Sequence, residues 1–148
     1  MRPTIANLLC LVLVMSGLGT PVAADAFVGV VKTVAGDAVI ERSGETITVG
    51  PGMEIRQADV VKTGRQGTVG LVFSDDTRIS MGPNTEIAVD DYLFEPLEEK
   101  LSFVLRLIRG TVSYLSGQMT KLAPESVQLV MPAATIGVRG THLLIKVD

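Results

Sequence analysis

Hydrophobic and polar positions alternate in short segments along most of the chain. The alternation is clearest over residues 46–49, 78–81 and 86–90, where isoleucine, valine or methionine takes every second position, and it returns over residues 142–147. A strand that buries one face and exposes the other has this period of two. Each of these segments is therefore predicted to be a β-strand.

Turn-forming residues separate the β-branched runs. They recur at short intervals, at Gly36, Gly44, Pro51-Gly52, Gly64, Asp75-Asp76, Gly82-Pro83, Gly110, Gly117 and Pro132. Short strands separated in this way predict an all-β, single-domain fold. The spacing suits either a twisted β-solenoid-like arrangement or a small two-sheet β-sandwich, and the sequence does not choose between them. We interpret Asp75-Asp76 as a solvated hairpin turn.

One segment fits both helical and strand periodicity. Apolar residues from Leu97 to Ile108 can share a helical face, yet residues 101–107 also alternate as a strand. We predict a strand from about residue 101, because a glycine and a further β-branched run follow at once. A helical turn over residues 95–100 stays open, within an acidic segment, 90–100, that we expect to be a surface excursion.

The N-terminus has the pattern of a signal peptide, residues 1–24. A positively charged start precedes the apolar core over residues 8–15, and Val22-Ala23-Ala24 offers small residues for cleavage. The core is much shorter than the roughly 20 residues that span a bilayer. We therefore predict cleavage after Ala24, a mature domain of residues 25–148 with no membrane insertion, and a periplasmic or secreted location in a bacterium.

The inventory of side chains excludes several classes of function. The formal net charge is −3 without a cluster of Lys and Arg, so nucleic acid is not an expected partner. Cys10 lies in the predicted signal peptide and His142 is the one histidine, which rules out a Cys-His dyad and the usual zinc ligand sets in the mature domain. We expect His142 to be exposed. The acidic pairs Asp75-Asp76 and Asp90-Asp91 lack the spacing of a calcium loop. No enzymatic activity, cofactor or metal is predicted.

The most unusual string lies near the C-terminus, at Gly137-Val138-Arg139-Gly140-Thr141. Glycines weaken a strand unless the backbone bends or approaches another chain, so both glycines are expected to occupy bends. The string resembles the signature that closes the FecR-like domain, the periplasmic module of bacterial iron-dicitrate-type sensor and anti-sigma regulators.

The resemblance extends from about Gly36 to Val147, through segments 36–39, 59–64, 67–79, 84–87 and 107–112. It departs from the family at Asp76, where glycine is usual, and at Met131-Pro132, where Thr-Pro is common. The resemblance implies an all-β module without catalytic residues that contacts other proteins in the cell envelope. We expect this chain to be that exported module alone, without the anti-sigma segment, membrane span and further C-terminal domain of the regulators, and carry over no anti-sigma activity.

Two interpretations of Arg139 stay open, an internal brace that satisfies several acceptors and a presented recognition residue. For the domain, we favour a non-enzymatic interaction or signalling module that contacts a separately encoded envelope or membrane protein. The alternative is a protein that binds envelope polysaccharide or peptidoglycan, against which the shortage of aromatic residues counts. Residues 141–148, with no covering element after them, are expected to form an edge strand that could pair with the partner or in a homo-oligomer.

Overall fold

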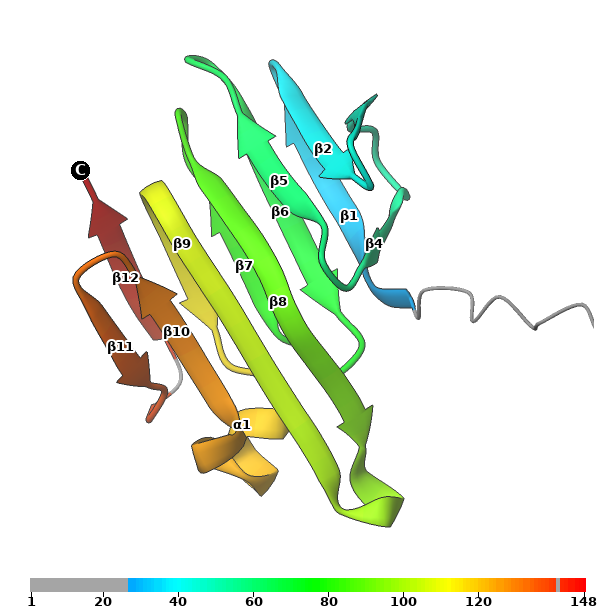
Figure 1. Cartoon of the computed structure of the whole chain (residues 1–148), viewed down its shortest axis with the longest axis vertical. Coiled ribbons are helices and arrows are strands. Elements are labelled where there is room, and N and C mark those ends of the chain that lie inside the picture. Colours follow the sequence, from blue (N-terminus) through cyan, green and yellow to red (C-terminus); the bar gives the residue numbers. More distant parts are fainter. Residues whose placement is uncertain (1–26, 141) are drawn as a thin grey trace, which may run out of the picture.

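The computed structural model describes residues 27–140 and 142–148, and the predicted signal peptide lies outside the described residues. Strands dominate this part of the chain (Figure 1), in the order β1 (Phe27–Ala35), β2 (Ala38–Arg42), β3 (Glu45–Thr48), β4 (Glu54–Arg56), β5 (Val60–Thr63), β6 (Thr68–Phe73), β7 (Arg78–Met81), β8 (Glu86–Glu95), η1 (Pro96–Glu98), β9 (Lys100–Leu115), α1 (Gln118–Leu122), η2 (Pro124–Ser126), β10 (Val127–Met131), β11 (Ala134–Gly137) and β12 (His142–Val147).

The strands form one sheet that curls into an open half-barrel around the long strand β9. Residues 100–109 of β9 pair with β8, and part of the same stretch pairs with β10. Beyond this point, residues 110–115 pair with β12 and, in part, with β7. We call β4-β1-β6-β7-β9-β12 limb A and β3-β2-β5-β8-β9-β10-β11 limb B. Figure 1 shows limb B in front of limb A.

The core lies between the two limbs and is one continuous cluster of buried apolar residues. Its centre is aromatic: the ring of Phe103 lies 5.0 Å from that of Phe73 and 5.1 Å from that of Tyr92, between centroids. Phe73 belongs to limb A, whereas Tyr92 and the first part of β9 belong to limb B. Tilted and edge-to-face ring pairs of this kind stabilise a core beyond the area they bury, so these rings hold the limbs together.

The prediction of an all-β, single-domain fold is confirmed. Strand pairs are antiparallel except for the parallel pair β9 and β10. Antiparallel hairpins bury one face of each limb, as two packed sheets do, but both limbs belong to one curled sheet because they share β9.

The strand predicted from about Leu101 is confirmed. Residues 90–100 lie mostly at the surface, as expected, but most of them form the β8–β9 hairpin and not an irregular excursion. β8 runs through Glu95, which pairs with Lys100, and only the short turn η1 links it to β9. The acidic composition of this segment suggested a loop, but the segment is a strand. Tyr92, which lies among the acidic residues, points into the core and is 7% exposed. The helical turn left open over residues 95–100 is present as η1.

Candidate functional site

The Gly137-to-Thr141 string forms the end of β11 and the link to β12. Val138 is fully buried and belongs to the core, whereas Gly137, Arg139 and Gly140 are exposed. Thr141 lies outside the described residues. The string therefore anchors the link through one valine side chain and presents the residues on either side of it to solvent.

Arg139 makes no hydrogen bond or ion pair with another residue of the described ranges. Its exposure does not agree with the interpretation as an internal brace, and it agrees with the interpretation as a presented side chain. The expectation that both glycines occupy bends is correct for Gly140, whose φ is +110°, and wrong for Gly137. Gly137 pairs with Gln128 in a regular ladder, and nothing lies within 4 Å of where its Cβ would be.

Single substitutions in this string are expected to differ in their effect on the free energy of unfolding. Gly140→Ala should cost about 1 kcal/mol, because alanine is strained at a positive φ. Gly137→Ala and Arg139→Ala should each change the free energy of unfolding by less than about 0.5 kcal/mol, as exposed substitutions usually do. Urea unfolding of the three variants measures this. A loss of several kcal/mol in Arg139→Ala would restore the interpretation as a brace.

β12 is an outermost strand, as expected from the sequence. It pairs with β9 on one side, and no other described strand pairs with it. Its exposed face carries His142, Leu144 and Lys146, and Leu144 is 74% exposed. The exposure predicted for His142 is confirmed.

His142 contacts one potential nucleophile that the sequence analysis missed. Its Nε2 lies 2.8 Å from the Oγ of Ser113 on the neighbouring strand β9. Within the described residues, no carboxylate is hydrogen-bonded to His142, and the pair lies on an open sheet face. A serine nucleophile needs an oriented base and a site for the developing oxyanion, so this contact alone is not a catalytic arrangement.

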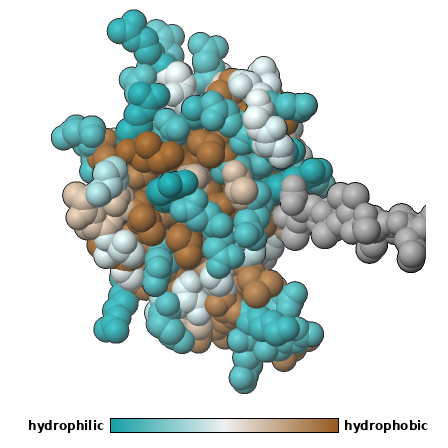
Figure 2. All heavy atoms as spheres, in the orientation of Figure 1, coloured by the Kyte–Doolittle hydropathy of each residue, from teal (hydrophilic) through white to brown (hydrophobic). Residues whose placement is uncertain are grey.

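The outer face of limb B is apolar but crossed by paired charges. Figure 2 shows apolar side chains gathered over this face and hydrophilic ones between them. Lys62 Nζ lies 2.6 Å from Glu41 Oε1 and 3.5 Å from Glu86 Oε1, and Arg109 Nε lies 3.5 Å from Glu86 Oε2. The hydrogen bond that the Lys62 ammonium donates to Glu41 is the main cause that raises the pKa of Lys62. These charges satisfy one another and leave little net charge for a partner.

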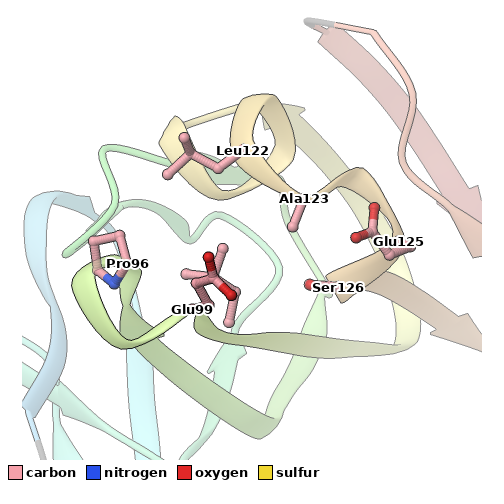
Figure 3. Close-up of a pocket in the computed structure, with 7 residues that line it drawn as sticks. Pro96, Glu99, Leu122, Ala123, Glu125 and Ser126 are labelled. Carbon is pink, nitrogen blue, oxygen red and sulfur yellow. The ribbon is translucent and has the colours of Figure 1, made fainter.

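A hollow lies between the β8–β9 hairpin and the α1–η2 segment (Figure 3). It has a volume of about 490 Å³, and we call it the hairpin hollow; it is lined by Pro96, Glu99, Leu101, Leu122, Ala123, Glu125 and Ser126. In Figure 3 the η1 turn with Pro96 and Glu99 faces α1 and η2 across the opening. Both walls therefore combine apolar surface with a carboxylate.

The wall that contains α1 is held in place by a buried carboxyl group, that of Asp75 in the β6–β7 turn. Asp75 Oδ2 accepts hydrogen bonds from the Met119 N–H at 3.2 Å and the Thr77 hydroxyl at 2.8 Å. Asp75 Oδ1 accepts from the Tyr92 hydroxyl at 3.1 Å and from the Thr77 N–H at 3.2 Å. The Gln118 N–H donates to the Asp75 carbonyl. One side chain thus ties α1, the β6–β7 turn and β8 together.

The solvated turn predicted for Asp75-Asp76 is correct for Asp76 and wrong for Asp75. Asp76 is exposed with φ +67°, whereas Asp75 is fully buried. Burial, followed by the charge of Asp75, raises the pKa of Tyr92 well above its ordinary value, so the tyrosine hydroxyl remains a donor to Asp75. The sequence contained one signal for a bonded Asp75, namely Thr77 two residues later. An aspartate side chain that accepts a hydrogen bond from the backbone two residues later closes an Asx turn.

The described residues contain no cluster of three or more His, Cys, Asp or Glu side chains able to hold a metal ion. Among the helices in the same residues, none is long and apolar enough to cross a membrane.

A model of the FecR protein family matches residues 59–148 of the chain, well over half of its length. The match contains the hairpin hollow, Asp75 and β12, while residues 36–58 of the resemblance fall outside it. No curated protein and no solved structure matches the chain significantly.

Proposed function

Because the chain belongs to the FecR family, a family of signalling and regulatory domains, we propose that it is an exported, non-enzymatic signalling module that binds a separately encoded protein of the cell envelope. The observation that supports this proposal most is the hairpin hollow. It lies in the family-matched part of the chain, and its α1 wall is fixed to the core through Asp75 and Met119.

Exposed apolar side chains gather around this end. Large hydrophobic residues are exposed at six described positions, and Leu93, Leu97 and Leu122 lie in the β8–β9 hairpin or in α1. Leu97 lies at the tip of the β8–β9 hairpin and is 100% exposed, so it contributes nothing to the core. Exposed apolar groups that cluster and have a polar rim are typical of protein-binding surfaces.

The charges around the hairpin hollow favour one kind of partner segment. Glu99 and Glu125 line it, and Lys100, the nearest cation of the hairpin, is already paired with Glu98 at 3.3 Å. An excess of carboxylates favours a partner segment that carries Lys or Arg beside an apolar side chain, since complementary charge speeds association and excludes other partners. The apolar side chain would contact Leu101 and Leu122, and the cation would approach the carboxylates.

The alternative of a polysaccharide or peptidoglycan binder has less support. Sugar-binding sites usually present aromatic rings as flat platforms. Four of the six aromatic residues, Phe73, Tyr92, Phe103 and Tyr114, are buried in the core and cannot serve as platforms. Phe27, which is 49% exposed, and the partly buried Phe94 are the two that remain.

The proposal is tested by cross-linking in intact envelopes of the source cells, with the unmodified chain and two variants of the hairpin hollow. Leu122→Ser and Glu125→Lys should each lower the yield of the partner adduct by about tenfold or more, as residues central to an interface do. Glu45→Lys, an equal charge reversal on the exposed strand β3, is the matched control and should leave the adduct unchanged. Adducts of equal yield in all four proteins would contradict the proposal.

A further inference from the structure

The open side of the half-barrel leaves β12 as an unprotected strand edge. The outermost strands of the two limbs are β3, β4, β11 and β12, which have 4, 3, 4 and 6 residues. Proteins protect exposed edges by keeping them short or by placing charges on them. β12 is the longest of the four, and Lys146 is its only permanent charge.

The inner face of β12 is apolar and incompletely covered. Leu143, Ile145 and Val147 pack against the core but are only half-buried, and so are Met131 and Ile136 on the facing strands of limb B. On β7, two strands further into limb A and separated from β12 by β9, the inward-facing residues Ile79 and Met81 are fully buried. The half-buried residues of β12 therefore lie at the open edge of the sheet, where a further strand paired with β12 would cover them.

We propose that β12 pairs with β12 of a second copy of this chain, antiparallel, with Ile145 opposite Ile145 on a two-fold axis. This inference goes beyond the proposed function and does not depend on it, because it uses a strand that does not line the hairpin hollow. The two copies of limb A then form one continuous sheet, in which backbone groups of each β12 that have no partner in one copy bond to the other.

The side chains select this register among the possible ones. Directly opposite residues lie on the same face of an antiparallel pair, so a shift by one residue would place the apolar row of one copy on the outer face of the other. With Ile145 on the axis, Leu143 lies opposite Val147 of the second copy. His142 then lies opposite Asp148, and Leu144 opposite Lys146.

The neighbouring registers that keep the faces matched are less favourable. An axis at Lys146 places two lysines opposite each other. Like charges in directly opposite positions destabilise a strand pair. An axis at Leu144 leaves Val147 without an apolar partner in β12, because position 141 would lie opposite it. The register centred on Ile145 is the one in which all three residues of the apolar row, Leu143, Ile145 and Val147, lie opposite apolar residues of the second copy.

Sedimentation and disulfide cross-linking test this pairing in the full-length chain. The unmodified protein should sediment as a dimer. In a series of single substitutions, Leu144→Cys, Ile145→Cys and Lys146→Cys, mild oxidation should cross-link Ile145→Cys about tenfold more than either neighbour, because only residues on the axis bring their Cβ atoms within disulfide range. The unmodified chain, whose only cysteine is Cys10, is the control.

A second readout covers the case in which Ile145→Cys does not fold. A mixture of the variants Leu143→Cys and Val147→Cys should form a mixed disulfide, whereas each variant alone should not. Strongest cross-linking at Leu144→Cys or Lys146→Cys, or a protein that sediments as a monomer throughout the concentration range, would overturn the proposal.

Discussion

Replacing Asp75 with alanine is expected to destabilise the domain by about 3–5 kcal/mol, among the largest effects of a single substitution. The substitution removes the acceptor of donors in Thr77, Tyr92 and Met119, all in buried surroundings. Unsatisfied buried donors lose their hydrogen bonds to water without a replacement. Urea unfolding measures the loss directly.

A conservative pair of substitutions separates the role of the side chain from that of the turn. Asp75→Asn keeps the shape but offers one acceptor oxygen fewer, and should cost about 1–3 kcal/mol. Asp76→Asn changes the exposed neighbour to a residue that tolerates a positive φ, and should stay within about 0.5 kcal/mol of the unmodified protein. Equal effects in the two asparagine variants would show that Asp75 does not organise the turn.

In Asp75 variants, structure should be lost first in the α1 wall of the hairpin hollow and only then in the rest of the fold. α1 is a helix of 5 residues, too short to be stable without tertiary contacts. Its first turn is attached to the β6–β7 turn through Asp75 and the Gln118 N–H. In Asp75→Asn, amide exchange is therefore expected to rise first in residues 118–122.

The alternation of side chains was sufficient to predict several of the strands, namely β3, β7, β9, β12 and the first half of β8, because burial of one face acts on every second residue of a strand. Segments 78–81 and 142–147 became β7 and β12 with the expected faces. The second half of β8 was not predictable in this way. Its acids Asp90, Asp91 and Glu95 are exposed or half-exposed while Tyr92 is buried, and a register shift between Val89 and Asp91 breaks the period of two.

The surfaces were harder to predict than the strands, because they depend on contacts between distant segments. The hairpin hollow lies between η1 on one side and α1 with η2 on the other. The antiparallel pairing of β8 and β9 places η1 there, and the contact of Asp75 with Met119 places α1. No local pattern indicates that contact. The edge position of β12 was expected from the sequence, and among the described strands β12 pairs with β9 alone.

The point at which β9 passes from limb B to limb A also depends on a long-range contact. Gly110 lies there with φ +96°, and a Cβ at this position would lie 2.4 Å from Thr85 Cα. The Thr85 hydroxyl accepts a hydrogen bond from the Thr111 N–H at 3.0 Å. Thr85 is held in turn by its N–H bond to the Thr63 hydroxyl, so the backbone has little room to move away.

Gly110→Ala is therefore expected to cost about 3 kcal/mol or more, the sum of a strained φ and an overlap with packed backbone. Thermal and urea unfolding measure the cost. Gly44→Ala is the matched control: its φ is +80°, but nothing lies within 4 Å of the added Cβ. It should cost only about 1 kcal/mol, the strain of the positive φ alone. If the two variants lose the same stability, the close approach of Thr85 to Gly110 does not constrain the crossing of β9, and the limbs must be held in register by the aromatic core.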